Sequence, residues 1–360
     1  MKIDTVGSFL PPQYLVHARN ESVQGKIDNT ALRNIENRAI TELIERQIKA
    51  GLSEVTSGEL RRTHWDKDFY FGLEGLSKAN FDSGRIYPNA ETATDLLRIT
   101  GRISYNPRHP FLEDFKFLKS TTSSETICRQ TLPSPANLYL ELLAMTDGHP
   151  GLIYPSAESL LDDISDAYRE TIMELYRLGC RSIQFDDTAC GLLCQDNFTK
   201  RLLQGGTDLL AIHEQIISLI NTSLAGLPAD LKTSLYLSGG DIIIPEWEYI
   251  EYPDNIMPKI LRDAAVDKFF MPFSLDDEYP FEILRHIPAN KHVVLGLIDA
   301  HSPFFEEKAQ LYKALEFARK HIESANISIS PRTGFKLSTY LHRGLTYEDQ
   351  WNKLSHLSTL

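Results

Sequence analysis

Short apolar runs recur along the chain, and longer segments with helically spaced apolar residues separate them. Eight of these runs are rich in β-branched or aromatic residues and have few polar positions, as expected of strands that are buried on both faces. The eight runs cover residues 2–6, 52–56, 126–132, 182–187, 233–238, 268–273, 292–298 and 327–330.

The segments between the runs predict amphipathic helices. Apolar residues recur three or four positions apart over residues 30–50, 157–178 and 304–321, and Gly51 supplies a stop for the first helix. Thr346, with acidic residues directly behind it, marks another helix start. Eight strands alternating with helices predict a parallel sheet, and eight is the number that closes a (β/α)8 TIM barrel. An open doubly wound sheet is the alternative, but no Gly-x-Gly-x-x-Gly follows the first run.

No low-complexity tract or Pro/Gly-rich linker divides the chain. We therefore expect one (β/α)8 barrel domain over residues 1–360. Residues 61–125 are too long for one connecting helix, and we interpret this stretch as an insertion after the second strand.

Composition narrows the class of protein. The net charge of −12 argues against nonspecific binding to nucleic acid or to an anionic membrane. No run of 18 apolar residues predicts a membrane span, and the N-terminal residues lack the apolar region of a signal peptide. The four cysteines are then expected to be reduced thiols. These features favour a cytoplasmic protein that binds a small molecule; they leave the oligomeric state open.

Polar residues cluster just beyond the ends of the predicted strands, where barrel enzymes carry their active sites. Each residue alone could form a loop salt bridge or cap a helix, but their convergence on one face favours a site for a polar ligand. The set comprises Ser8, Glu59, Arg61, Arg62, Ser134, Asp186, Asp187, Ser238, Asp241, Ser274, Asp299, His301 and Arg332.

Six segments, in the order in which they occur along the chain, resemble cobalamin-independent methionine synthase. The resemblance is both to its C-terminal catalytic barrel and to its short single-barrel relatives. The six segments are Thr5-Val-Gly-Ser-Phe, Thr56-Ser-Gly-Glu-Leu-Arg-Arg, Gln130-Thr-Leu-Pro-Ser-Pro, Gln184-Phe-Asp-Asp, Gly296-Leu-Ile-Asp-Ala-His-Ser-Pro and Ile329-Ser-Pro-Arg-Thr-Gly-Phe. Their spacing matches over nearly the whole chain. The resemblance implies a (β/α)8 barrel of the methionine synthase and uroporphyrinogen decarboxylase type. It also implies transfer of a methyl group from a methyltetrahydrofolate to the thiol of homocysteine, with zinc activating the thiolate.

The resemblance carries several site residues over. Val6, Gly7 and Ser8 match the family's segment that holds the amino acid substrate, and Glu59 matches the glutamate after its second strand. Asp186 matches the aspartate that binds the substrate ammonium, although Asp187 and Thr188 replace the Glu and Pro that follow it in the family.

A second matching motif implies a general acid. Asp299 and His301 match the family's Asp-x-His-Ser-Pro, whose histidine is proposed to protonate the pterin. A histidine suits proton transfer near neutral pH. The alternative is that both residues only begin the helix near residue 304, where a carboxylate is favoured by the positive helix end.

The family's zinc ligands have no counterpart in this sequence. Tyr236, Ser238, Pro272 and Thr333 stand where the family has His, Cys, Glu and Cys. Hydroxyl groups and proline do not replace imidazole and thiolate at such a site, so we expect no metal ligand among these four.

Other residues could in principle supply a metal site. Cys190 and Cys194 lie four positions apart, and His64 lies close to Asp66. Neither group has the spacing of a structural zinc site, and the cysteine pair is more typical of buried packing.

These observations favour a methionine-synthase-like enzyme that binds a folate or a similar polar molecule without the zinc–thiolate mechanism. Three alternatives remain open. The chain could be an authentic methyltransferase with unrecognised metal ligands, a metal-free lyase or decarboxylase, or a non-catalytic binding protein.

Overall fold

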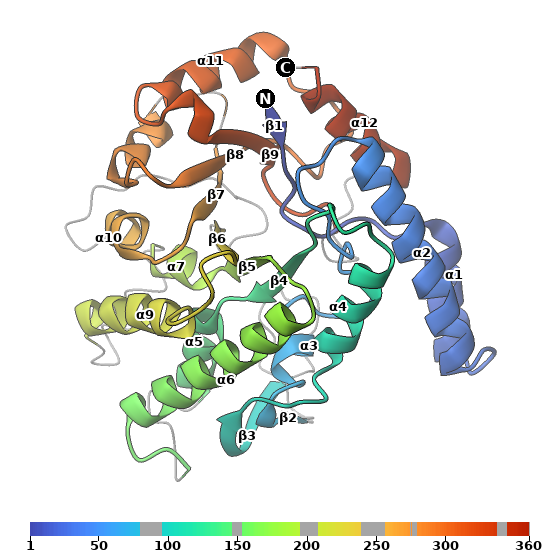
Figure 1. Cartoon of the computed structure of the whole chain (residues 1–360), viewed down its shortest axis with the longest axis vertical. Helices are drawn as coiled ribbons and strands as arrows, with labels where there is room; N and C mark the ends of the chain where they lie inside the picture. The colour runs from blue at the N-terminus through green and yellow to red at the C-terminus, as the bar shows by residue number, and fades with distance from the viewer. Residues whose placement is uncertain are drawn as a thin grey trace.

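Parallel strands curl into a single sheet that helices surround on the outside (Figure 1). The computed structural model describes residues 1–79, 96–145, 153–194, 208–238, 256–273, 275, 279–336 and 344–359. The strand order is β1-β9-β8-β7-β6-β5-β4, and all neighbouring pairs are parallel. The strands are β1 (Lys2–Ile3), β4 (Arg129–Pro133), β5 (Ser182–Asp187), β6 (Lys232–Leu237), β7 (Lys268–Pro272), β8 (His292–Ile298) and β9 (Ile327–Pro331).

The segment around Val55 closes this sheet into a barrel. Val55 forms a parallel bridge with Cys128, and its amide donates to the Ile127 carbonyl at 2.9 Å. On its other side the Ser53 amide donates to the Ile3 carbonyl at 3.3 Å. The segment therefore lies between β4 and β1 and occupies the eighth strand position of the barrel, which confirms the (β/α)8 prediction.

Two predicted strands are shorter than expected, because side chains take over their backbone hydrogen bonds. In the 52–56 run, the Gln47 side chain accepts from the Thr56 amide at 3.0 Å and donates to its carbonyl at 2.8 Å. In the 2–6 run, the Arg129 guanidinium donates to the Thr5 carbonyl and the Gln184 amide donates to the Val6 carbonyl. These side chains supply hydrogen bonds to backbone groups at the ends of the two runs, where the regular pairing stops.

Helices follow the strands as the sequence predicts. Residues 30–50 correspond to α2 (Asn29–Lys49), residues 157–178 to α6 (Ala157–Arg177) and residues 304–321 to the shorter α11 (Lys308–Arg319). Thr346 begins α12 (Tyr347–Leu357) with a capping box that it shares with Asp349. Among the described residues outside 61–125, the structure also has α1 (Gln13–Val23), α5 (Pro135–Met145), α7 (Ala189–Leu193), α9 (Leu209–Ser223), α10 (Ile256–Asp263), η1 (Tyr279–His286) and η2 (Ser324–Asn326).

The stretch 61–125 holds α3 (Lys67–Tyr70), an antiparallel hairpin and α4 (Pro110–Ser120). The hairpin consists of β2 (Glu74–Ala79) and β3 (Leu96–Ser104), and residues 80–95 between its strands lie outside the described residues. Arg102 of β3 forms a two-pronged ion pair with Asp163 of α6, at 2.6 and 2.7 Å. The hairpin is therefore attached to the outer helical layer, and α4 occupies the helix position before β4.

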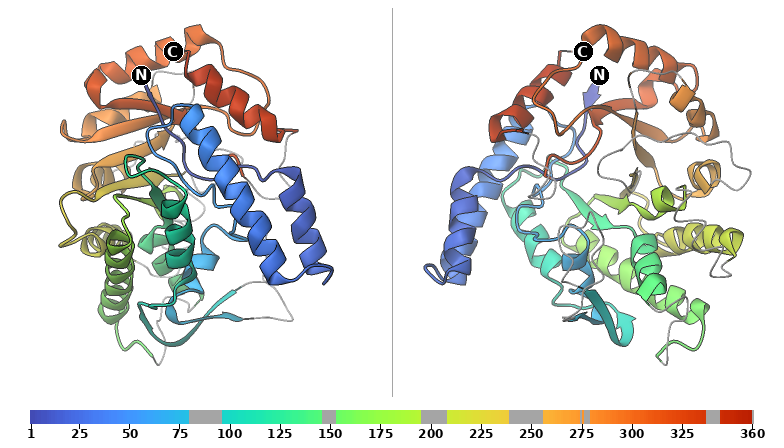
Figure 2. Two further views of the ribbon diagram at one scale, coloured as in Figure 1. Left: turned by 45° about the vertical axis from the view of Figure 1, so that its right-hand side comes forward. Right: turned by 180° about the vertical axis from the view of Figure 1, so that it is seen from behind.

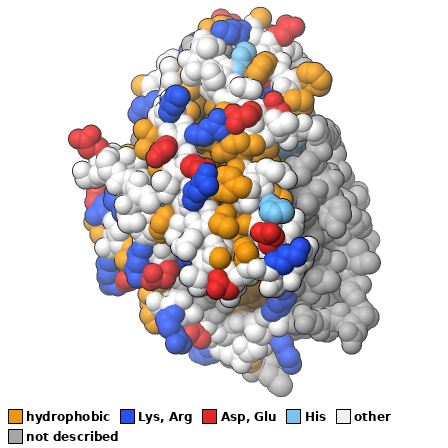
Figure 3. All heavy atoms as spheres, turned by 90° about the vertical axis from the view of Figure 1, so that its right-hand side faces the viewer, with side chains coloured by type: hydrophobic (Ala, Val, Ile, Leu, Met, Phe, Trp, Pro, Cys, Tyr) orange, Lys and Arg blue, Asp and Glu red, His pale blue; other side chains and the backbone are white. Residues whose placement is uncertain are grey.

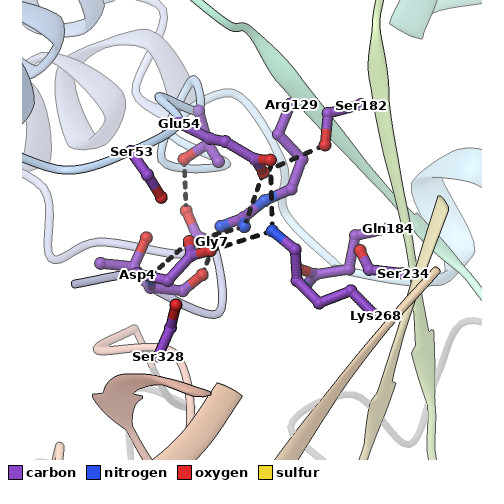
Figure 4. Close-up of polar contacts among 12 residues, drawn as sticks. Asp4, Gly7, Ser53, Glu54, Arg129, Ser182, Gln184, Ser234, Lys268 and Ser328 are labelled. Atoms are coloured by element: carbon purple, nitrogen blue, oxygen red, sulfur yellow. Dashed lines mark hydrogen bonds and ion pairs between the residues drawn. The ribbon is translucent and has the colours of Figure 1, made fainter. Parts of the chain in front are cut away.

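A balanced cluster of charges fills the end of the barrel where the strands begin (Figure 4). The fully buried Arg129 guanidinium donates to Asp4 at 2.7 Å and to Glu54 at 3.1 Å. Lys268 contacts both carboxylates at 3.2 Å, and the Ser182 hydroxyl donates to Glu54 at 3.0 Å. Two cations thus face two anions, and the hydrogen bonds offset much of the cost of burying them.

An apolar layer lies above this cluster inside the barrel. It is formed by Val6, Tyr236, Phe270 and Val294, which are all buried. The Arg129 guanidinium lies 5.0 Å from the centre of the Phe270 ring. The barrel interior therefore passes from ionic to apolar in successive layers toward the strand ends.

On the outside, the side that carries α1 and α2 shows acidic and basic side chains interspersed (Figure 3). The two chain ends lie close together (Figure 2). Within the described part of the chain, no helix is long and apolar enough to cross a membrane.

Candidate active site

A cavity of about 160 Å³ opens at the ends of the strands, on the far side of the apolar layer from the charge cluster. Its walls come from widely separated parts of the sequence because the carboxyl ends of parallel strands meet at one face. The lining residues are Val6, Ser8, Glu59, Trp65, Asp186, Asp187, Thr188, Tyr236, Ser238, His301, Thr333, Gly334 and Lys336.

Asp187 and Ser238 of the predicted polar set line this cavity. Five of the seven residues that the family resemblance assigns to the site line it as well: Val6, Ser8, Glu59, Asp186 and His301. The other two lie beside them. A side chain on Gly7, which has φ of +140°, would come within 2.7 Å of Thr131, so this position supplies backbone. The Asp299 carboxylate accepts from the His301 amide at 2.8 Å. The structure therefore brings these residues together at one cavity, and their chemical roles stay predictions.

Two of the polar positions proposed from the sequence, Asp241 and Ser274, lie outside the described residues. Arg61 and Arg62 are adjacent in the sequence but have different partners. Arg61 points to the helical layer, where it contacts Asp114 at 2.6 Å, and Arg62 turns to the cavity glutamate.

Glu59 is held in one orientation by a buried network. Its carboxylate accepts from the Thr131 hydroxyl at 2.7 Å and pairs with Arg62 at 3.1 Å. Arg62 also donates to the Thr131 carbonyl at 2.6 Å. Glu59 has φ of 55°, a left-handed conformation that a non-glycine residue rarely adopts. Backbone strain of this kind is frequent at functional sites, where the surrounding structure enforces it.

The buried carboxyl group of Asp186 accepts a hydrogen bond from a neutral side chain. Its Oδ1 accepts from the Gln184 amide at 2.6 Å. Burial, together with the nearby Glu59 charge, raises the pKa of Asp186 well above its ordinary value. Glu59 and Asp186 therefore form an acidic pair that a cationic ligand group would stabilise.

Asp187 adds a third carboxyl group. Its Oδ1 accepts from the Cys190 amide at 2.8 Å, at the start of α7. Burial raises the pKa of Asp187 as well. Asp186 and Asp187 thus place two adjacent carboxyl groups on one wall of the cavity.

His301 is held by a residue from the neighbouring strand end. Its Nε2 lies 2.8 Å from the Thr333 hydroxyl, and its Nδ1 lies 3.9 Å from the Asp299 carboxylate. The loop that carries His301 is fixed in turn. Glu306 accepts from the Asp299 amide at 2.7 Å, and the buried Lys353 of α12 contacts Glu306 at 3.5 Å. A histidine held this firmly can transfer a proton to or from a ligand.

Sequence reasoning missed several walls of the cavity. Trp65 and Lys336 line it, and the Lys336 ammonium donates to the Arg62 carbonyl at 2.8 Å. Neither residue follows a strand directly, so position relative to the strands gave no signal. The Arg-Arg-x-x-Trp spacing in the loop after the second strand was the available hint.

Gly334 is a further wall that only the structure identifies. A side chain at this position would come within 1.9 Å of the Ser8 hydroxyl. A side chain here would force the Ser8 hydroxyl to turn away, so the glycine lets the loops after β1 and β9 pack closely.

Comparison with known proteins gives the family. No family model matches the sequence. The Bacillus subtilis protein YxjH, described as uncharacterized, is 30% identical over 99% of this chain and 92% of its own length. A crystal structure from Listeria monocytogenes, described as a "Putative Vitamin-B12 Independent Methionine Synthase", has 28% identity and a TM-score of 0.77 over 99% of this chain and 95% of that one. The chain belongs to the cobalamin-independent methionine synthase family.

More distant members agree in fold. The methionine synthase of Saccharolobus solfataricus is 21% identical over 95% of this chain and 90% of its own length. A B12-independent methionine synthase from Shewanella, solved with selenomethionine, has 21% identity and a TM-score of 0.71 over 99% of this chain and 95% of that chain.

The residues at the family's zinc positions do not fit that metal. The Tyr236 hydroxyl donates to the Arg332 carbonyl at 3.2 Å, and burial raises the pKa of this phenol. Thr333 is bound to His301, and Pro272 pairs with Gly296 in the sheet. Ser238 lines the cavity with a hydroxyl group. Neutral hydroxyls already bound to protein groups, and a proline, do not form a zinc site.

The other sulfur groups are poorly suited to a metal site. Cys190 is fully buried, and burial raises its pKa well above the ordinary value. Burial also raises the pKa of Cys194 to about 12. Among the described residues, no group of three or more His, Cys, Asp and Glu side chains is arranged to hold a metal ion.

Proposed function

We propose that this chain is an enzyme that binds a reduced folate, or a heterocycle of similar size, at the barrel mouth and acts without zinc. The observation that carries the proposal is the composition of one cavity. Glu59, Asp186 and His301 line it, while the family's metal positions there hold Tyr236, Ser238 and Thr333.

The cavity volume sets the size of the group that enters. A cavity of about 150 Å³ in another protein holds one benzene molecule. At about 160 Å³ this cavity accepts one ring system or the backbone of one amino acid. The rest of a folate would extend through the open mouth.

The charges support distinct roles. Glu59 and Asp186 form the acidic wall, which favours an ammonium group or a protonated ring nitrogen. His301 lies on the same cavity and can supply or remove a proton. Because the pKa of Asp186 is raised in the ligand-free protein, binding of a cation would displace its proton to solvent.

Isothermal titration calorimetry tests this proposal. We expect tetrahydrofolate or 5-methyltetrahydrofolate to bind with a dissociation constant below about 1 mM, which corresponds to about 4 kcal/mol. Glu59→Gln and Asp186→Asn should weaken binding, and His321→Gln, a change outside the cavity, is the matched control. Absence of binding by both folates would refute the folate proposal.

Turnover and metal assays separate the alternatives. Stoichiometric zinc in the purified protein would support the methyltransferase with unrecognised ligands. Binding of folate without turnover of any methyl or carboxyl group would support a binding protein. Decarboxylation without methyl transfer would support the lyase.

A further inference from the structure

Gln184 is a fully buried residue that lies behind the cavity wall and is not part of its lining. It precedes Asp186 by two residues on β5, so both side chains point to the same face of the strand. Its Nε2 donates to Asp186 Oδ1 at 2.6 Å and to the Val6 carbonyl at 2.5 Å. Gln184 therefore contacts two residues that line the cavity, one on β5 and one after β1.

The orientation of the Gln184 amide follows from its partners. A primary amide nitrogen carries two hydrogens, and the two acceptors use both of them. A peptide carbonyl can only accept, so Oε1 cannot take the place of Nε2 beside Val6. Among the described residues Oε1 has no hydrogen-bond partner, so nothing on that side favours the opposite orientation.

This orientation decides which oxygen of Asp186 can carry a proton. Oδ1 accepts from Gln184, and in a protonated carboxyl group the carbonyl oxygen is the better acceptor. A proton on Asp186 therefore lies on Oδ2. Burial and the Glu59 charge raise the pKa of Asp186, and the Gln184 hydrogen bond offsets part of this rise. In the ligand-free protein the carboxyl group is thus neutral near its ordinary pKa, with its proton on the oxygen that Gln184 does not contact.

The other carboxylate of the acidic pair has different partners. Glu59 contacts the charged Arg62 at 3.1 Å and accepts from the Thr131 hydroxyl at 2.7 Å. Asp186 accepts from the neutral Gln184 amide. Asp186 is therefore the carboxyl group of the pair for which a basic group of a ligand would complete the hydrogen bonding.

We propose that Gln184 is a positioning residue, which keeps Oδ1 of Asp186 occupied and leaves Oδ2, with its proton, to a basic nitrogen of the ligand. The Oδ2–H bond breaks as the N–H bond forms on the ligand, and the carboxylate pairs with the cation that results. The two Gln184 hydrogen bonds persist throughout this step. The ligand in this inference rests on the proposed function, whereas the placement of the proton on Asp186 does not.

Infrared difference spectroscopy of the full-length protein tests the placement without any ligand. At about pH 5 most carboxyl groups of ordinary pKa are ionised, so the wild type minus Asp186→Asn isolates the carbonyl band of protonated Asp186. A carbonyl group that accepts a hydrogen bond absorbs at lower frequency than a free one. We therefore expect this band at higher frequency in Gln184→Met, measured against its own double variant with Asp186→Asn.

A second buried glutamine supplies the matched control. Gln350 is also fully buried, but its side chain binds the backbone of Leu10, so Gln350→Met should leave the Asp186 band in place. An unshifted band in Gln184→Met, or no carboxyl band in the wild type, would overturn the inference. If Gln184→Met does not fold, Gln184→Glu takes its place with the same expectation, because this side chain has a similar shape but at most one donor for the two acceptors.

Calorimetry with tetrahydrofolate and 5-methyltetrahydrofolate tests the coupling to the ligand. Gln184→Met should weaken binding about five- to tenfold, as expected for one lost hydrogen bond, and Gln350→Met should not. In an Asp186→Ala background, Gln184→Met should cause no further loss, because Gln184 acts through Asp186. Wild-type affinity in Gln184→Met, or a further loss in that background, would overturn the inference. If the wild type binds neither folate, the proposed function fails, and the infrared result alone decides the role of Gln184.

Discussion

Two buried aspartates lie in opposite electrostatic surroundings, and replacing each by asparagine should change stability in opposite directions. Asp4 lies between Arg129 and Lys268, at 2.7 and 3.2 Å. Asp186 accepts one hydrogen bond from the neutral Gln184 amide and lies near Glu59. Burial alone raises a carboxyl pKa, but the two cations bring the pKa of Asp4 below its ordinary value. Burial and Glu59 together raise the pKa of Asp186.

The sign of each contribution follows from linkage. A lowered pKa in the folded state stabilises the protein above the unfolded value of about 3.9, and this contribution disappears as the pH falls through the folded pKa. Asp4 therefore stabilises the barrel at neutral pH. A raised pKa does the reverse, because stability declines as the pH rises from about 3.9 through the folded pKa. Asp186 therefore destabilises the ligand-free barrel at neutral pH.

The magnitudes follow from what each change leaves behind. Asp4→Asn leaves Arg129 and Lys268 facing Glu54 alone, and removal of one partner from a buried ion pair costs about 3–5 kcal/mol. We expect the lower end, about 3 kcal/mol, since Lys268 keeps some exposure. Asp186→Asn should stabilise the ligand-free protein, because asparagine removes a buried carboxylate whose pKa is raised by burial and by the Glu59 charge.

Urea unfolding of the full-length protein measures both effects. At about pH 7 the midpoint should fall for Asp4→Asn and rise for Asp186→Asn. At about pH 4 the rise should largely disappear, because that pH lies near the unfolded pKa, whereas the fall should persist there, because the folded pKa of Asp4 lies below its ordinary value. Asp263→Asn, at an exposed ion pair with Arg262, is the control and should leave the midpoint unchanged. In the same protein, Asp186→Asn should weaken binding of an ammonium-bearing ligand by about 1.5–3 kcal/mol. A lower midpoint for Asp186→Asn would refute the reasoning, because it would mean that the carboxylate is stabilised in the empty site.

Three further predictions concern the cavity and its chemistry. Protein purified without chelator should contain no stoichiometric zinc by elemental analysis, and about one zinc per chain, lost on substitution of Cys190 or Cys194, would contradict this expectation. Because Trp65 lines the cavity, folate binding should quench tryptophan fluorescence, and Trp65→Phe should remove most of that quenching; unchanged quenching would place the ligand elsewhere. Gly334→Ala would bring a methyl group within 1.9 Å of the Ser8 hydroxyl, so calorimetry should show weaker ligand binding, whereas an unaltered affinity would show that the two loops can separate at no cost.

The sequence predicts the barrel well because its signals are local and repeated. A strand buried on both faces is apolar at successive positions, as in residues 292–298, and this pattern needs no knowledge of the neighbouring strand. The sequence signals for helix boundaries are also local. The Asp28 side chain accepts from the Ala31 amide at the start of α2, and Gly51 with φ of +76° follows its end. The placement of Glu59, Asp186 and His301 on one cavity follows from the parallel topology alone.

The features that the sequence does not predict depend on long-range side-chain contacts. Residues 2–6 have the pattern of a strand, yet the side chains of Arg129 and Gln184, from other strands, donate hydrogen bonds to carbonyl groups of this run. The charge cluster likewise joins Asp4 to Lys268, which are 264 residues apart. In the sequence each of these residues is an isolated polar position beside an apolar run, with nothing to indicate its partner.

The layering of the barrel separates the packing of its interior from most of the side chains at the strand ends. The ionic layer and the apolar layer of Val6, Phe270 and Val294 fill the interior without using the strand-end side chains. Val6 and Tyr236 belong to both levels, since each packs in the apolar layer and also lines the cavity. A histidine at position 236 would be smaller than the tyrosine and would leave a void in that layer. The residue that displaces a metal ligand here also completes the core, so the zinc site and the present packing are alternatives at this position.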